Sequence, residues 1–219
     1  PVAPRMIESS PMVFAHLSAE QSELESGDLI FSIDGVRVSR LADGLLPFIA
    51  ASNQASRDVA LLRALTLGDC ASARVVVDRH GVEQQLQIAR APVRALDSTR
   101  LYSHDRPGET LQFLTDEIAY LKLSSIRAAD IPQMLVAATA TRGLIVDIRN
   151  YPGDFVPFVL GSGLMQKATP FVRFTGPDVG NPGAFRWREP TIIEPKGPSY
   201  GGNVIVLVDE MSISQSEYT

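Results

Sequence analysis

Two short clusters of polar residues carry the chemistry that this sequence could perform. In the first, Ser212, Ser214 and Ser216 alternate with other residues, and Glu217 follows directly. A serine hydroxyl at a turn between a strand and a helix can act as a nucleophile, because the helix N-terminus stabilises negative charge near its oxygen. The spacing of Ser214 and Glu217 is also the capping-box pattern of an ordinary helix start. Taken alone, these serines leave both interpretations open.

The second cluster, residues 147–154, contains Pro152 followed by Gly153. Proline fixes its own φ, and the following glycine can direct its backbone N–H into a cavity, as an oxyanion hole requires. A Pro-Gly pair is equally common in ordinary turns. This cluster is therefore also compatible with a purely structural role.

Each cluster follows a run of apolar residues that predicts a buried strand. Residues 143–148 lead into the Pro-Gly cluster, and residues 204–208 lead into the serines. A strand at residues 118–123 and a helix from about residue 130 precede them, so the order is β-α-β and predicts a mostly parallel sheet. Ligands of such sheets bind beyond the carboxyl ends of the strands, which is where both clusters are expected.

The first part of the chain predicts a separate β-rich domain. An Asp-Gly turn at residues 34–35 and a His-Gly turn at residues 80–81 each separate two β-prone runs, which indicates two hairpins. Residues 91–110 are polar and contain proline and glycine, as is typical of a crossing between domains. We therefore expect two domains, residues 1–95 and 96–219.

The composition argues against several classes of function. A net charge of −5, with no run of basic residues, gives no footprint for nucleic acid. The lone Cys70 and three scattered histidines are too few for a zinc site or an internal disulfide, so we expect no metal and no other cofactor. No apolar stretch is long enough to predict an integral membrane segment.

Together, the two clusters resemble the signature stretches of the C-terminal processing (tail-specific) and tricorn-like serine peptidases. Residues 143–153 read Gly-Leu-Ile-Val-Asp-Ile-Arg-Asn-Tyr-Pro-Gly, and residues 204–217 read Val-Ile-Val-Leu-Val-Asp-Glu-Met-Ser-Ile-Ser-Gln-Ser-Glu. Residues 26–36 resemble the Gly-Asp core of the PDZ modules that precede this peptidase domain. The resemblance implies an α/β fold (α+β overall), in which a PDZ-like domain is followed by an incomplete peptidase core of the ClpP/crotonase-like spiral type.

The resemblance also implies roles for three residues. The middle serine of the motif, Ser214, is the implied nucleophile, and the backbone N–H groups of Gly153 and Gln215 are the implied oxyanion hole. Asp154 stands where many members of the family carry a second glycine, so we expect the loop to differ there. By the same resemblance, the substrate is a peptide or protein, and the enzyme is exported to the periplasm or the extracellular space.

The sequence does not identify the general base. Processing peptidases use a lysine beyond the nucleophile, whereas Lys122, Lys167 and Lys196 all precede Ser214. Tricorn-like members use histidine and acidic groups, but His104 lies in a polar segment that we interpret as an exposed loop. We therefore expect these 219 residues to be a fragment that is inactive alone. Uncovered apolar sheet surface in such a fragment would favour a homo-oligomer.

Two alternatives to the enzyme remain. A PDZ-type module binds a peptide as an added strand, so the protein could be a peptide-binding scaffold with a degenerate peptidase domain. The carboxylate-binding loop of such modules is not recognisable before Met12. In the second alternative, the chain is an α/β binding domain whose serine-rich turn only caps a helix.

Overall fold

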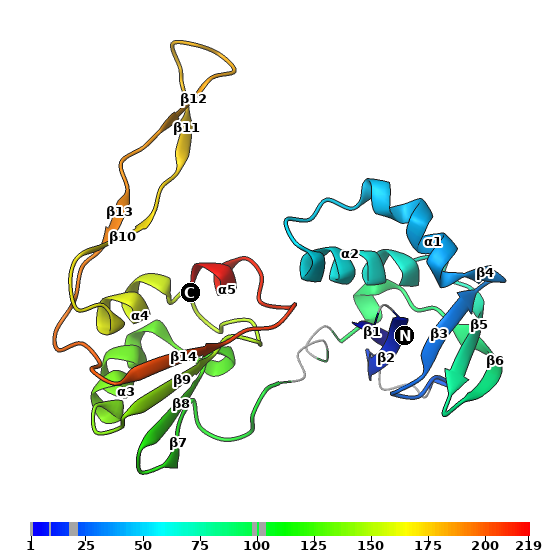
Figure 1. The fold of residues 1–219 in the computed structure, drawn as a ribbon, viewed down its shortest axis with the longest axis horizontal. Coiled ribbons are helices and arrows are strands. Elements are labelled where there is room, and N and C mark those ends of the chain that lie inside the picture. The colour runs from blue at the N-terminus through cyan, green and yellow to red at the C-terminus, as the bar shows by residue number, and fades with distance from the viewer. Residues whose placement is uncertain (1, 9, 18–21, 98–99, 101–103) are drawn as a thin grey trace. The chain divides into compact units, whose positions relative to one another are not determined.

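The chain forms two compact units, Pro1–Ser103 and His104–Thr219 (Figure 1). The structure is a computed structural model that describes residues 2–8, 10–17, 22–97, 100 and 104–219. Both units combine helices with sheets, as the α+β class requires. The second unit begins at His104, which lies after the boundary predicted at residues 95 and 96.

The first unit is built on an antiparallel sheet with two helices. The described residues give the strand order β1-β2-β3-β5-β6, and β4 pairs with β3. These strands are β1 (Val2–Ile7), β2 (Ser10–His16), β3 (Leu29–Ile33), β4 (Val36–Arg37), β5 (Ser72–Arg79) and β6 (Val82–Ala89). The helices are α1 (Val38–Leu45) and α2 (Gln54–Thr66), with short 3-10 turns at η1 (Leu46–Phe48) and η2 (Val93–Ala95).

Both predicted hairpins of the first unit are present. Asp34 and Gly35 join β3 to β4 with φ of 52° and 81°, and His80 and Gly81 join β5 to β6 with φ of 55° and 82°. Two consecutive positive φ values match the right-handed twist of the strands, which is why these residue types occur there. Beside the first hairpin, the buried Asp28 accepts two hydrogen bonds of 2.7 Å from the guanidinium of Arg79.

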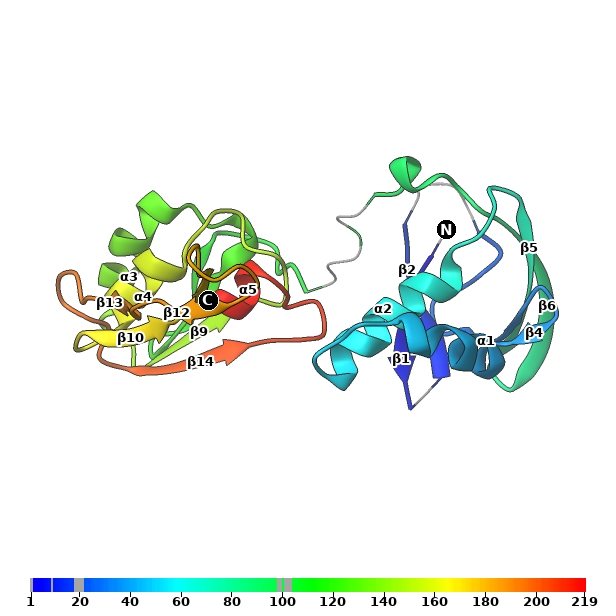
Figure 2. The same ribbon diagram turned by 90° about the horizontal axis from the view of Figure 1, so that it is seen from above.

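The second unit is built on a four-stranded sheet in the order β14-β9-β8-β7. β7 (Leu111–Thr115) and β8 (Ile118–Lys122) form a hairpin, while β8, β9 (Gly143–Asp147) and β14 (Asn203–Leu207) run parallel, with β14 beside β9 (Figure 2). The helices are α3 (Ile131–Ala138), α4 (Pro157–Leu164) and α5 (Gln215–Tyr218), and 3-10 turns occur at η4 (Leu123–Ser125) and η5 (Ala128–Asp130). α3 connects β8 to β9, which confirms the predicted β-α-β order.

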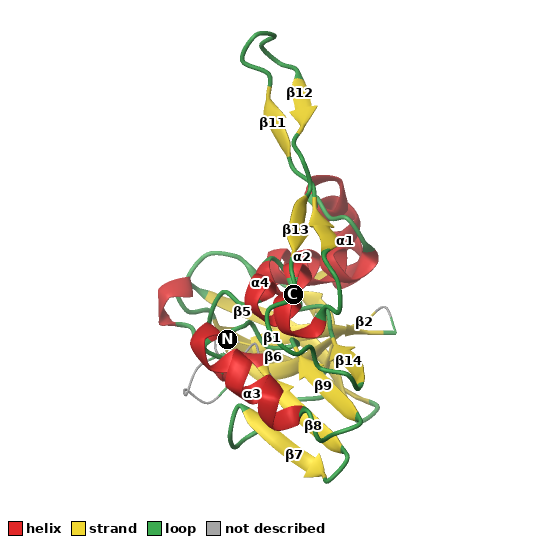
Figure 3. Cartoon of the chain, turned by 90° about the vertical axis from the view of Figure 1, so that its left-hand side faces the viewer, coloured by secondary structure: helices red, strands yellow, loops and turns green. Residues whose placement is uncertain are grey.

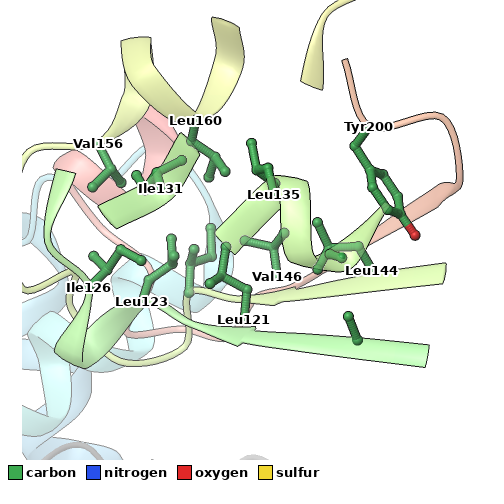
Figure 4. Packing of buried hydrophobic residues seen from close by; sticks show 13 residues of the cluster. Leu121, Leu123, Ile126, Ile131, Leu135, Leu144, Val146, Val156, Leu160 and Tyr200 are labelled. Carbon is green, nitrogen blue, oxygen red and sulfur yellow. The ribbon is translucent and has the colours of Figure 1, made fainter. Parts of the chain in front are cut away.

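The core of the second unit lies between the sheet and the helices α3 and α4 (Figure 4). Leu121, Leu144 and Val146 point from the strands toward Ile131 and Leu135 of α3. Side chains of a strand alternate between its two faces, so Lys122 and Asp147 point to the opposite face from this core. The polar ends of β8 and β9 are thereby separated from the apolar layer.

A two-stranded arm extends from the second unit between α4 and β14 (Figure 3). It consists of β10 (Thr169–Val172) paired with β13 (Thr191–Ile193), and β11 (Thr175–Pro177) paired with β12 (Phe185–Trp187). Within the described residues, no helix is long and apolar enough to cross a membrane.

Candidate active site

The two polar clusters meet at one edge of the second sheet. β9 and β14 are neighbours and run parallel, so the residues that follow them start from the same edge. Two hydrogen bonds then join the clusters: Ser212 Oγ donates to the carbonyl of Ile148 at 3.1 Å, and the side-chain N–H of Gln215 donates to the carbonyl of Asp154. The serine turn and the Pro-Gly loop therefore form one site.

Ser214 occupies a strained turn between β14 and α5. Its φ is 57° and its ψ is −116°, so it lies outside the left-handed helical region as well as the common ones. The other described non-glycine residues with positive φ, Glu8, Asp34 and His80, lie in hairpin turns. A strained, exposed serine immediately before a helix is the geometry of a nucleophile elbow, which presents the hydroxyl to solvent.

The three serines differ in their surroundings. Ser212 holds the Pro-Gly loop through Ile148, and Ser216 is 1% exposed, with no hydrogen-bond partner for its Oγ among the described residues. Ser214 is exposed. Of the three hydroxyls, that of Ser214 is the one a substrate can reach.

The start of α5 is satisfied through the backbone of Ser214. The N–H of Ser214 donates to the carboxylate of Glu217 at 2.9 Å, and the N–H of Glu217 donates to the carbonyl of Ser214 at 3.0 Å. The Ser214 hydroxyl oxygen also faces the N–H of Glu217, which completes a capping box, and an oxygen that accepts there still carries its own proton. The capping pattern and a chemical role for Ser214 are therefore compatible.

The two predicted oxyanion donors differ in availability. Gln215 is the first residue of α5, where a backbone N–H has no acceptor within its own helix. The N–H of Gly153 instead donates to the carbonyl of Leu123 at 2.9 Å. A Cβ on Gly153 would lie 2.7 Å from the carbonyl oxygen of Ser124, so close packing against η4 explains this glycine. An oxyanion role for Gly153 stays a prediction and requires the bond to Leu123 to break.

A buried carboxylate fixes the start of the Pro-Gly loop. Asp147 is 3% exposed and accepts hydrogen bonds from Tyr120 Oη at 2.6 Å and from Arg149 Nη2 at 2.7 Å and Nε at 2.9 Å. Burial favours a higher pKa for Asp147, but the hydrogen bonds from Arg149 and Tyr120 outweigh it, so the pKa is lowered. Burial, together with the bond to Asp147, raises the pKa of Tyr120 to about 12. Asp147 therefore stays charged and anchors Arg149.

His104 lies against both flanks of the site, which corrects its interpretation as an exposed loop residue. Its Nδ1 is 3.3 Å from Arg149 Nη1, and its Nε2 is 3.5 Å from Asp209 Oδ2, on the turn that leads to Ser214. Because a guanidinium can only donate, Nδ1 must accept this hydrogen bond, and a neutral ring then carries its proton on Nε2, toward Asp209. No local motif marks His104, which is why sequence patterns missed it.

The described residues contain no group of three or more histidine, cysteine, aspartate or glutamate side chains that could hold a metal ion.

Comparisons with known proteins identify the fold. No protein-family model and no curated protein matches the sequence. The structure is similar to that of mature CPAF, a chlamydial serine protease, with a TM-score of 0.68 and 10% sequence identity. The matched region covers 100% of this chain and 64% of the CPAF chain. CPAF complexed with lactacystin gives a TM-score of 0.68 at 11% identity, covering 99% of this chain and 66% of that one. The chain therefore has a peptidase-like fold and spans less than two thirds of the mature CPAF chain.

Proposed function

We propose that the protein is a serine endopeptidase of the C-terminal processing or tricorn-like type, with Ser214 as its nucleophile. The observation that carries this proposal is the conformation of Ser214, an exposed serine held at φ 57° and ψ −116° directly before α5. The similarity to CPAF supports it, since the CPAF structures include a complex with lactacystin and a serine-to-alanine mutant. As the resemblance implies, such an enzyme would act in the periplasm or the extracellular space.

The proposed reaction passes through an acyl-enzyme. Ser214 Oγ forms a bond to the peptide carbonyl carbon as its proton moves to a base, and the base then protonates the amine that leaves when the C–N bond breaks. Water hydrolyses the ester in the second half. In this proposal the N–H of Gln215, at the start of α5, stabilises the oxyanion.

His104 is the base that the described residues support best. It contacts Arg149 on the Pro-Gly loop and Asp209 on the serine turn, so both sides of the site contribute to its position. Both ring nitrogens face these partners: Nε2 carries its proton toward Asp209, and the lone pair of Nδ1 accepts from Arg149. To take the proton of Ser214, Nδ1 must therefore first release Arg149. The base expected from the processing peptidases, a lysine outside these residues, is the competing assignment.

A second candidate function, peptide binding by a PDZ-like first unit, is supported by an apolar pocket. Most residues that line this pocket come from β3, β5, β6 and the segment that follows β6, and Val2 of β1 and Leu65 of α2 also line it. β1 and β6 are the two edges of this sheet in the described residues, so an extended peptide could pair with either as a further strand. In a peptidase this unit would deliver substrate, and in a scaffold protein it would be the functional part.

The test uses the protein expressed from its complete gene. A fluorophosphonate probe should label the wild type at Ser214, and Ser214→Ala should lose both labelling and peptide cleavage. Ser216→Ala is the matched control on the same turn and should still be labelled. His104→Gln should slow labelling strongly if His104 is the base. A folded wild-type protein that neither labels nor cleaves would favour the peptide-binding function.

A further inference from the structure

Lys122 is a buried lysine at the carboxyl end of β8. It is 6% exposed, and its Nζ donates to the carbonyls of Arg106 at 2.9 Å and Gly108 at 3.2 Å. The same Nζ lies 3.5 Å from Oδ1 of Asp105. The ammonium thus makes two hydrogen bonds and one ion pair, all with residues 105–108, which directly follow His104.

We infer that Lys122 is a positioning residue of the candidate active site, holding residues 105–108 and through them His104. This inference rests on the proposed function, because it takes His104 as the base. A lysine is seldom buried without partners, so its set of acceptors indicates that its charge has a specific use here. That use is to fix a segment that has no regular secondary structure of its own.

The sheet register explains how Lys122 and Asp147 act on the same histidine. The two residues are directly paired between the parallel strands β8 and β9, so their side chains leave the same face of the sheet. Asp147 fixes Arg149, which contacts Nδ1 of His104. Lys122 fixes residues 105–108, which follow His104 in the chain. The backbone and the ring of His104 are therefore anchored by adjacent residues of one sheet edge.

A second anchor supports the same segment. Ser124 Oγ donates to Oδ1 of Asp105 at 2.6 Å, and the guanidinium of Arg106 lies over the ring of Tyr120 at 5.8 Å from its centroid. These contacts come from side chains and can persist when Lys122 is replaced. Gln112 Nε2 also donates to the carbonyl of Pro107 at 3.1 Å, so the contribution specific to Lys122 is the hydrogen bonding of the carbonyls on either side, those of Arg106 and Gly108.

Positioning of a base is measurable because a displacement of about 1 Å can lower a rate about 100-fold. In the protein expressed from its complete gene, Lys122→Met keeps an unbranched apolar side chain and removes the ammonium. We expect kcat for a peptide substrate to fall about 10–100-fold with KM nearly unchanged, because a displaced base slows the chemical step and not the binding of substrate. Lys122→Arg, which keeps a charged donor, should recover part of the loss.

A matched control separates positioning from general loss of stability. Thr141 is 5% exposed and donates to the carbonyl of Ala138 at 2.7 Å, just before the amino end of β9, so Thr141→Ala also removes buried hydrogen bonding from this unit. It should leave kcat within about twofold of the wild type, since Thr141 lies at the opposite end of β9 from Asp147 and contacts none of the residues of the candidate site. Equal kcat losses in the Lys122→Met and Thr141→Ala proteins would overturn the inference.

A readout independent of activity distinguishes this inference from the proposed function. Diethyl pyrocarbonate modifies histidines, and its reaction with His104 can be followed by mass spectrometry with His80 as an internal reference. Freeing residues 105–108 should accelerate modification of His104 at least about threefold in Lys122→Met, because the segment opens more often. If the wild type proves inactive, the proposed function fails while faster modification still supports positioning. Unchanged modification in a folded Lys122→Met protein refutes it.

Discussion

Replacing Ser214 with glycine should make the second unit more stable than replacing it with alanine. A residue with a side chain is strained by about 1–3 kcal/mol in a sparsely populated region of φ and ψ such as 57° and −116°. Alanine keeps this strain and glycine relieves it. Glycine also increases the entropy of the unfolded chain, which destabilises by about 0.4–1 kcal/mol relative to alanine. The balance predicts that Ser214→Gly is about 1 kcal/mol more stable than Ser214→Ala.

The control for this prediction is an exposed residue with ordinary backbone angles. Thr139 lies at the end of α3 with φ of −60° and ψ of −23°, so Thr139→Gly should be less stable than Thr139→Ala by about 0.4–1 kcal/mol. Hydrogen exchange of the β8 and β9 amides, measured at increasing urea concentrations, would report the stability of the second unit. If glycine destabilises at Ser214 as it does at Thr139, the turn is not strained, and strain no longer marks Ser214 as the nucleophile.

Three further changes test the surroundings of the site. Tyr120→Phe removes a donor from the buried Asp147 and should lower the unfolding free energy by about 1–3 kcal/mol in urea; alkaline absorbance titration should also lose a tyrosine of pKa about 12. Gly153→Ala forces a methyl group to 2.7 Å from the Ser124 carbonyl and should lower stability by about 1–3 kcal/mol in thermal unfolding. Because the pKa of Asp147 is lower in the folded protein than in the unfolded chain, where it is about 3.9, its charge stabilises the fold above about pH 3.9. This stabilisation is lost as the pH falls through the folded pKa. The unfolding free energy of Asp147→Asn should therefore depend less on pH in the acid range than that of the wild type.

The meeting of the two polar clusters was predictable because it depends on local patterns. Apolar runs specify β9 and β14, and a parallel arrangement places the residues that follow both strands at one edge. The difference between Ser212, Ser214 and Ser216 was not predictable from their spacing alone. It arises where the strand turns into α5, which exposes Ser214 and buries Ser216.

The place of His104 depends on contacts between residues far apart in the sequence. Its neighbours Arg149 and Asp209 follow two different strands, and the segment after it is held by Lys122 from a third. No periodicity or dipeptide signal encodes such a meeting, so a polar segment beside a predicted domain boundary was interpreted as an exposed loop. Gly153 shows a related ambiguity, because a glycine can be required by close packing or by the use of its N–H.

Catalysis by Ser214 would require two hydrogen bonds to change in concert with the substrate. The N–H of Gly153 would have to leave the carbonyl of Leu123, and Nδ1 of His104 would have to release Arg149. An oxyanion is a stronger acceptor than a neutral carbonyl, so charge developing on the substrate favours the first exchange. Protonation of His104 as it takes the proton of Ser214 then strengthens its attraction to Asp209 and opposes its contact with Arg149, until the proton passes to the leaving amine. The hydrogen bonds of the site without substrate thus differ from those that the transition state would favour. The free energy of substrate binding would offset the cost of exchanging them.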